Sequence, residues 1–595
     1  MTQFLKNILS LLVLVLAFVF LFTLIQTKHI WGDIYIEQIL INLEDGISVA
    51  SDKLLLGYAI SAVLGIITAI SLSLILKNNF HLLITSCLCF LFVFYQIGIF
   101  SYFFHKNVHS KIYEKEYAYP QNIDFTFLNS KRNLIVIYLE SIEENYATSP
   151  YLRSNLIPNI FGLMKTSLSF EGFYQLKRQD YTAAAMVQSM CAVPYKKSVL
   201  KGHISHENFL ANLVCYPQIL EQNDYQTVFI KGADIKFAKA DLFMRTHGFK
   251  KVMGKDQLKK EYPSFPLTNN RGAFSGYRDG TLYEMIKLEL LNLSKSEKPF
   301  ALSFITLDTH TPDYFLSPEC NPASSHKEAV VHCADTMLSN FLNWLKVQDF
   351  YQNTTVVVLA DHTETGNNSL YPKEKNRKII NFILNPSPIF TKKPHTAFTT
   401  LDIAPTILNA LGIHFKDGKF GLGRSLFQVE PTLLEKMGLK LETELLKSSE
   451  VYESFETTKV KSEPQYHLYA PLGIKLSTPD EINHYTTYAN TVLDTVFSDE
   501  LSFTLPKTEN QSLSIEFTYK AMLVSQNKRT FKIMINNHLL EEITITSKDK
   551  QPLSKTIKFS TSLLNKDKLL LQFKDEDETI SDSLGIGLLS LSIKP

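Results

Sequence analysis

The sequence predicts three parts in succession: transmembrane helices at the N-terminus, an α/β domain with a largely parallel sheet, and a C-terminal β-sandwich. Long apolar runs predict the first part, and short, continuously apolar runs separated by helix-length segments predict the second. Short strand-like runs broken by turn residues predict the third. The chain of 595 residues is too long for one ordinary domain, as this order requires.

Residues 1–105 contain three apolar runs, at 8–25, 54–76 and 81–100. Each is long enough, or nearly so, to cross a hydrocarbon core about 30 Å thick. No small-residue cleavage site follows the first run and two more runs succeed it, so it is not a cleaved signal peptide. We expect a three-helix transmembrane region, the alternative being buried helices of a soluble protein.

The orientation follows from the basic residues near these runs. Lys6 precedes the first run and Lys77 lies between the second and third, whereas the loop 31–52 is acidic. Because basic residues favour the cytoplasmic side, the N-terminus is expected inside and everything after about residue 105 outside.

Four cysteines follow the apolar runs, and four allow three disulfide pairings. Proximity in the chain favours Cys191 with Cys215 and Cys320 with Cys333, and an oxidising compartment would let both bonds form. Four unrelated buried thiols are the alternative.

The charges of the chain nearly cancel, with 60 basic and 59 acidic residues. This balance gives no indication of nucleic-acid binding, so no nucleic-acid partner is expected. An anionic ligand would have to be held by a local cluster.

The outer part divides by composition. Residues 106–132 form a polar connector and 428–463 a helical linker rich in Glu, Lys, Leu and Ser. Between them, 133–427 is the α/β domain, and 464–595 is a β-sandwich of the jelly-roll kind. Strands of the α/β domain are expected at 133–139, 226–230, 301–307, 354–360 and 378–384.

Two of these strands end in metal-ligand residues. Strand 133–139 leads into Glu140 and Ser141, and strand 354–360 leads into Asp361, His362 and then Glu364. Ligands bind at the carboxyl ends of parallel strands, so these side chains should converge. Two carboxylates and one imidazole suit a divalent cation such as Mn²⁺, Mg²⁺ or Zn²⁺. Singly, each residue is as well explained as a helix cap or ion-pair partner.

A third candidate lies between these strands, in the segment 178–190 (RQDYTAAAMVQSM). Residues 183–190 favour a helix, which places Thr182 near its N-terminus. There the helix dipole and free amides favour an alkoxide and a phosphate oxygen, as a nucleophile attacking phosphorus requires. From this segment alone, a plain helix cap is the more ordinary explanation.

Five motifs together resemble a known family. They are LESIEENY from Leu139, DYTAAAM from Asp180, LDTHTPD from Leu307, ADHTE from Ala360 and GLGRSL from Gly421. In this order they resemble membrane-anchored members of the alkaline phosphatase and sulfatase superfamily, most of all phosphoglycerol transferase I and, more distantly, lipoteichoic acid synthases. The resemblance spans about 133–426, and includes the segment 231–249 and the four cysteines.

The resemblance implies roles for individual residues. It implies one metal ion, Mn²⁺ before Mg²⁺ or Zn²⁺, bound by Glu140, Thr182, Asp361 and His362. Thr182 would also be the nucleophile and His310 would bind or protonate the substrate. Three further basic residues are candidates for substrate binding, although a solvated side chain is the simpler explanation for each: Arg178, Lys231 and Lys239.

The implied activity is transfer of a phosphoglycerol head group from an anionic phospholipid to a periplasmic or surface glycan, by a multi-pass protein of the bacterial inner membrane. Three alternatives remain: a phosphoethanolamine transferase, a sulfatase, and a non-catalytic glycan-binding membrane protein. The sulfatase is disfavoured because a C-x-P-x-R signature is replaced by CAVPYK at Cys191.

Overall fold

The computed structural model describes residues 2–39, 52–76, 78–128, 130–196, 210–267, 273–318, 320, 326–365, 370 and 376–455. Beyond these it describes 485–486, 500–504, 512–521, 528–536, 538–546, 553–560, 562, 568–575 and 586–594. The chain forms two compact units, Met1–Thr457 and Thr458–Pro595.

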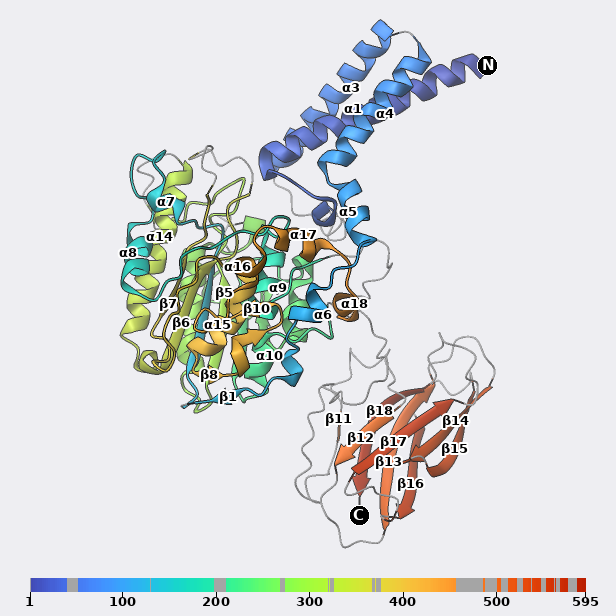
Figure 1. Cartoon of the computed structure of the whole chain (residues 1–595), viewed down its shortest axis with the longest axis vertical. Helices are drawn as coiled ribbons and strands as arrows, with labels where there is room; N and C mark the ends of the chain where they lie inside the picture. Colours follow the sequence, from blue (N-terminus) through green and yellow to red (C-terminus); the bar gives the residue numbers. More distant parts are fainter. Residues whose placement is uncertain are drawn as a thin grey trace. The chain divides into compact units, whose positions relative to one another are not determined.

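Three long helices open the first unit (Figure 1): α1 (Thr2–Trp31), α3 (Asp52–Leu76) and α4 (Asn79–Gln96). By length and apolar composition, Phe4–Trp31, Leu55–Leu76 and Asn79–Gln96 can each cross a membrane, as predicted. Many of their large apolar side chains are exposed, which suits a lipid environment. A short helix, α5 (Ile99–Lys106), follows α4 after Gly98, whose φ is 73°.

A six-stranded sheet forms the core of the rest of this unit, in the order β4-β3-β5-β2-β6-β7. Its strands are β2 (Asn133–Leu139), β3 (Gln226–Lys231), β4 (Lys251–Met253), β5 (Phe300–Ile305), β6 (Thr354–Ala360) and β7 (Asn381–Leu384). Every neighbouring pair is parallel except β6 and β7, so the sheet is mixed. Strand β7 is thus an antiparallel edge strand. A parallel β7 would need a crossover connection, which is usually a helix, and none of the described residues between β6 and β7 is helical.

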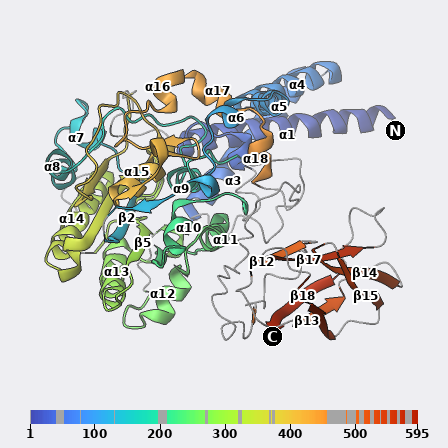
Figure 2. The same ribbon diagram turned by 60° about the horizontal axis from the view of Figure 1, so that its bottom comes forward.

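Helices cover both faces of this sheet (Figures 1 and 2). On one face, α14 (His326–Lys346) packs against α8 (Pro158–Thr166) and α13 (Asp279–Leu293). On the other, α15 (Ile403–Ala410) packs against α9 (Thr182–Cys191) and α10 (Tyr216–Glu221). Strands β2, β5 and β6 are almost wholly buried between these layers, which explains their continuous apolar runs.

Both predicted disulfides are present. Cys191 at the end of α9 is bonded to Cys215 before α10, with 4.1 Å between their Cα atoms. Cys320 is bonded to Cys333 in α14, with 5.7 Å between the Cα atoms. The first bond joins two helices on the α9 face, and the second ties a loop to the α14 helix on the opposite face.

Arg424, in the motif GLGRSL, has a structural role. Its side chain is 1% exposed and donates to the carboxylate of Glu116 at 2.8 Å, while its backbone N–H donates to Asp402 at 2.8 Å. The motif GLGRSL therefore fastens the connector to the domain. Three short helices follow within the expected linker: α16 (Leu433–Met437), α17 (Lys440–Leu446) and α18 (Glu450–Ser454). The expected linker residues 456–463 lie outside the described residues.

The second unit contains two four-stranded sheets whose paired strands are all antiparallel. One has the order β11 (Tyr485–Thr486), β18 (Ile586–Lys594), β13 (Ser512–Ala521), β16 (Leu553–Ser560), and the other β12 (Glu500–Thr504), β17 (Lys568–Asp575), β14 (Lys528–Ile535), β15 (His538–Thr546). Ile533 and Ile535 of β14 and Ile557 of β16 are buried. The described part is thus all β, as the sequence predicts, and the jelly-roll arrangement stays a prediction.

Candidate active site

Three ligand-type side chains meet at the carboxyl end of the sheet. Glu140 follows β2, while Asp361 and His362 follow β6, and these strands are parallel neighbours. One ligand atom from each residue lies within 4.8 Å of the other two. All three residues are buried, so the parallel sheet delivers two carboxylates and one imidazole to a shielded point.

Thr182 begins helix α9 and completes this cluster. Its hydroxyl oxygen lies 3.5 Å from Oε2 of Glu140 and 3.5 Å from Nε2 of His362. The imidazole Nε2 of His362 is in turn 3.3 Å from Oδ2 of Asp361. Four ligand atoms in a tetrahedron with metal bonds of about 2.1 Å would be separated by about 3.4 Å. The spacing therefore fits a single divalent cation.

The hydrogen bonds of Asp361 point to the same conclusion. Its Oδ1 accepts from the backbone N–H groups of Ser141 at 3.0 Å and His362 at 2.9 Å. Its Oδ2 is buried and has no hydrogen-bond partner within the described part of the chain. A buried carboxylate oxygen without a partner is costly, and a cation would satisfy it.

Ser141 is not one of the grouped ligand-type residues, but it orients two of them, Glu140 and Asp361. Its backbone has a φ of 52°, and its hydroxyl donates to Oε1 of Glu140 at 2.6 Å. Together with its N–H bond to Asp361, this fixes both carboxylates. The sequence correctly predicted that Ser141 lies at the strand end. The apolar pattern did not predict its positive φ.

Glu364 is separated from the cluster, contrary to its inclusion among the ligand-type residues at the strand ends. Its carboxylate accepts from Nζ of Lys327 at 2.5 Å, from the hydroxyl of Tyr146 at 3.1 Å and from the hydroxyl of Tyr314. These cationic and phenolic groups occupy the carboxylate, which explains why it turns away from the ligand site.

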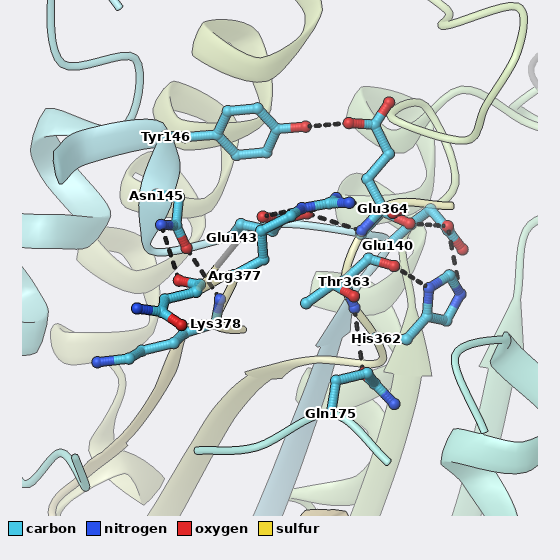
Figure 3. A network of polar contacts seen from close by, with 12 residues as sticks. Glu140, Glu143, Asn145, Tyr146, Gln175, His362, Thr363, Glu364, Arg377 and Lys378 are labelled. Atoms are coloured by element: carbon cyan, nitrogen blue, oxygen red, sulfur yellow. Dashed lines mark hydrogen bonds and ion pairs between the residues drawn. The ribbon is translucent and has the colours of Figure 1, made fainter. Parts of the chain in front are cut away.

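A second network, missed from the sequence, supports the loop that carries His362 (Figure 3). Arg377 donates through Nε to Glu143 at 3.0 Å and through Nη2 to the carbonyl of Glu364 at 2.7 Å. Glu143 also accepts from the backbone N–H of Glu364 at 2.8 Å. Arg377 lies 234 residues from Glu143, and no local pattern connects them.

His310 lies on a loop that is fastened to the same strand end. Asp279 accepts from the backbone N–H groups of Leu307 and Asp308, both at 2.8 Å. The hydroxyl of Thr309 donates to the carbonyl of Glu140 at 2.6 Å. The motif LDTH is therefore held beside the ligand cluster by Asp279 and by its own Thr309.

The surroundings of His310 are aromatic and basic. Its ring centroid lies 4.8 Å from that of Phe274, at a nearly perpendicular angle. The ammonium of Lys231, at the end of β3, lies 5.7 Å from the same Phe274 ring and 5.4 Å from that of Phe237. Lys231 is thus on the His310 side of the site, while Lys239 precedes α11 (Ala240–Thr246) with a φ of 53°. Substrate contacts of both lysines stay predictions.

Arg178 is paired within the protein. Its guanidinium forms an ion pair with Glu37 at 3.0 Å and donates to the hydroxyl of Ser101 at 3.0 Å. Its assignment to substrate stays a prediction, and any such role has to accommodate this ion pair.

About half of the chain is similar to known proteins. Residues 132–413 match the sulfatase family. These residues form a sulfatase-family domain.

The relatives of this chain share only part of their length with it. Phosphoglycerol transferase I of Escherichia fergusonii is 30% identical over 309 residues, which are 50% of this chain and 39% of that protein. The protein of that name from Shigella flexneri is 30% identical over 317 residues, 52% of this chain and 40% of its own. The chain therefore spans about two fifths of the curated relatives it matches.

Two solved structures are also similar. The lipoteichoic acid synthase LtaP from Listeria monocytogenes has a TM-score of 0.40 and 20% identity, covering 52% of this chain and 79% of its own. The phosphoglycerol transferase GacH from Streptococcus pyogenes has a TM-score of 0.36 and 19% identity, covering 57% of this chain and 82% of its own.

The electrostatics of the sulfatase-family site fit a bound cation. Burial, followed by the negative charge of the neighbouring Glu140, raises the pKa of Asp361 to about 6. Burial lowers the pKa of His362, but Asp361 and Glu140 outweigh this and the pKa is raised overall. Two carboxylates that repel each other in a dry site are stabilised by any added positive charge.

His310 is electrostatically different. Burial, followed by the charge of His362, lowers the pKa of His310 to about 4. The free ring is therefore neutral near pH 7, and it can donate one hydrogen bond or accept a proton.

Proposed function

We propose that the chain is a metal-dependent phosphoglycerol transferase that moves the glycerophosphate head group of phosphatidylglycerol to a periplasmic or surface glycan. The observation that carries this proposal is the Thr182 hydroxyl, placed at a helix N-terminus beside Glu140 and His362. The relatives named phosphoglycerol transferase I support the choice of head group.

In this proposal one divalent cation, Mn²⁺ before Mg²⁺ or Zn²⁺, is bound by Glu140, Thr182, Asp361 and His362. When bound, it lowers the pKa of the Thr182 hydroxyl and offsets negative charge on the phosphoryl oxygens. Ser141 keeps the two carboxylates in position throughout.

Before the first step Thr182 gives its hydroxyl proton to solvent, and in that step its alkoxide oxygen attacks the phosphorus of the lipid head group. A bond forms between this oxygen and phosphorus, and the bond from phosphorus to the diacylglycerol oxygen breaks. The free N–H groups at the start of α9 face the phosphoryl oxygens and stabilise their charge. The product is a phosphoglycerol ester of Thr182 together with diacylglycerol.

His310 carries the proton between the two steps. The proposed acid in the first step is the protonated ring of His310, a form that an anionic phosphodiester favours, and it gives this proton to the diacylglycerol oxygen. The neutral ring then takes a proton from the acceptor hydroxyl, whose oxygen attacks the same phosphorus and releases Thr182 as the alkoxide. The lowered pKa keeps the free ring neutral near pH 7, which is the form that can accept a proton.

The proposed location is the bacterial inner membrane, with the sulfatase-family domain in the periplasm. The acidic loop 31–52 and the basic Lys6 and Lys77 support this orientation, and the two disulfides suit an oxidising compartment. The phospholipid donor is then available at the outer leaflet.

The test uses the full-length protein in vesicles with phosphatidylglycerol or phosphatidylethanolamine. Metal-dependent release of diacylglycerol from phosphatidylglycerol, with a glycerophosphate mass increase on a periplasmic glucan, is the expected result. Release from phosphatidylethanolamine alone would replace the proposal with a phosphoethanolamine transferase. Thr182→Ala serves as the inactive control.

A further inference from the structure

The chain segment that leaves the first membrane helix contacts the loop that leads to Thr182. Arg178 lies four positions before Thr182 in the sequence. Its Nη1 is 3.0 Å from Oε1 of Glu37, and its guanidinium lies 4.4 Å from the ring centroid of Tyr35. Glu37 and Tyr35 follow the end of α1 at Trp31 by only a few residues. Membrane segment and nucleophile loop are therefore joined directly.

The contact between Arg178 and Glu37 is largely buried and has further partners. The side chains of Arg178 and Glu37 are 10% and 16% exposed, so the ion pair is far less screened than one on the surface. Nη2 of Arg178 also donates to Ser101 of α5, so the guanidinium joins two membrane-side segments. A Cβ on Gly98 would lie 3.1 Å from Nη2, and Gly98 leaves this space open.

Trp31 brings the same membrane helix to the substrate side of the site. Its ring centroid lies 6.2 Å from that of His310, in an edge arrangement. His310 in turn contacts Phe274, beside Lys231. Trp31 therefore extends an aromatic surface that begins inside the catalytic domain and ends on a membrane helix.

We propose that Trp31–Glu37 is the membrane-side wall of the donor site, and that the Arg178–Glu37 ion pair holds this wall against the nucleophile loop. The inference rests on the proposed function, in which a phospholipid head group must reach Thr182 while its acyl chains stay in the bilayer. A wall that continues from a membrane span lies at the level where such a head group enters. Arg178 is then a positioning residue, and Trp31 contacts the bound head group.

A charge exchange in the full-length protein in vesicles tests the ion pair. Arg178→Glu and Glu37→Arg should each lower turnover of phosphatidylglycerol at least tenfold, and by a clearly larger factor than they lower hydrolysis of a soluble chromogenic phosphodiester. The double exchange should restore lipid turnover. Lys250→Glu breaks the Lys250–Glu221 ion pair, in which the lysine side chain is 68% exposed, and controls for the charge change alone.

A second measurement reports the solvent accessibility of Trp31 and does not require enzyme activity. The chain has two tryptophans, so Trp344→Phe leaves Trp31 as the only one. Acrylamide should quench Trp31 fluorescence at least twofold more strongly in each single exchange than in the parent, and the double exchange should reverse this. The fluorescence measurement tests the ion pair even if the protein turns over no phospholipid. Absence of phospholipid turnover would contradict the proposed function and not the role of the ion pair.

Three results would overturn the inference. The first is unchanged quenching of Trp31 in both single exchanges, because the ion pair would then hold nothing in place. The second is altered quenching with unchanged lipid turnover, because the wall would lie outside the donor site. The third is an equal fall with the lipid and the soluble diester that the double exchange does not restore, because Arg178 would then act within the reacting site.

Discussion

The hydroxyl oxygen of Thr182 lies 3.5 Å from Nε2 of His362, although 180 residues separate them in the chain. A threonine at the start of a helix usually serves as a cap, yet this one faces an imidazole and the carboxylate of Glu140. That position defines the proposed nucleophile.

Replacement of this hydroxyl should abolish transfer and preserve the fold. Thr182→Ala removes one oxygen and one methyl group from a partly buried position, so the melting temperature should stay within a few degrees, whereas turnover should fall at least about a thousandfold. Thr182→Ser keeps the hydroxyl and should retain part of the activity. Turnover of Thr182→Ala within tenfold of the parent would refute the covalent mechanism.

Neutral replacements of the buried carboxylates should remove metal. Asp361→Asn and Glu140→Gln each take one negative charge from the cluster, and elemental analysis of the purified protein should find less than a tenth of the parent's divalent metal. Glu289→Gln is the control, because Glu289 is a buried carboxylate that pairs instead with Lys251 and Tyr262. Full metal content in both site variants would contradict the ligand assignment.

Metal binding should weaken in acid. Asp361 must be ionised to bind a cation, and its pKa in the metal-free protein is about 6, so protons compete with metal below that pH. The raised pKa also means that the metal-free folded state binds more protons than the unfolded state between about pH 4 and 6. The contribution of Asp361 to the free energy of unfolding of the metal-free protein therefore declines as pH rises through that window.

Thermal melting with and without Mn²⁺ measures this effect. The metal-induced rise in melting temperature should be larger at about pH 7.5 than at about pH 5, and Asp361→Asn should remove most of the difference. An equal rise at both values in the parent protein would show that Asp361 does not take part in binding.

The Glu143–Arg377 network should tune metal affinity without contacting the metal. Glu143 accepts from Arg377 and from the backbone N–H of Glu364, two residues after His362. Glu143→Gln should lower metal affinity about 10- to 100-fold, as measured by calorimetry, because supporting hydrogen bonds orient ligands. The comparison variant is Lys251→Met, which breaks an ion pair between a partly exposed lysine and the buried Glu289 away from the site. Unchanged affinity in Glu143→Gln would leave the network a role in stability alone.

The ligand cluster was predictable because two features coincide in the sequence. Continuous apolar runs mark buried parallel strands, and the polar residues directly after them fall at one edge of the sheet. The disulfides followed from proximity in the chain. The partners of Arg178 and of Glu143 were not predictable, because an ion pair between distant residues leaves no local pattern. The reversed direction of β7 likewise depends on how the chain crosses the sheet edge and not on its apolar run.

The C-terminal unit provides the last prediction. Its described strands form two antiparallel sheets, and β14 and β15 pair across a turn at Asn536, whose φ is 46°. If these sheets form a carbohydrate-binding sandwich, a weak glycan site in the same chain as the catalytic domain would raise the effective concentration of a polymeric acceptor. A short acceptor gains nothing from such tethering.

Deletion of residues 464–595 should therefore affect the two acceptors differently. With a short soluble acceptor, turnover should stay within about twofold, whereas turnover with a polymeric envelope glycan should fall about 10- to 100-fold. Metal content and the melting temperature of the remaining unit control for loss of the fold. Equal activity of the truncated and full-length proteins on the polymer would refute tethering, and loss of bound metal would assign the unit a structural role.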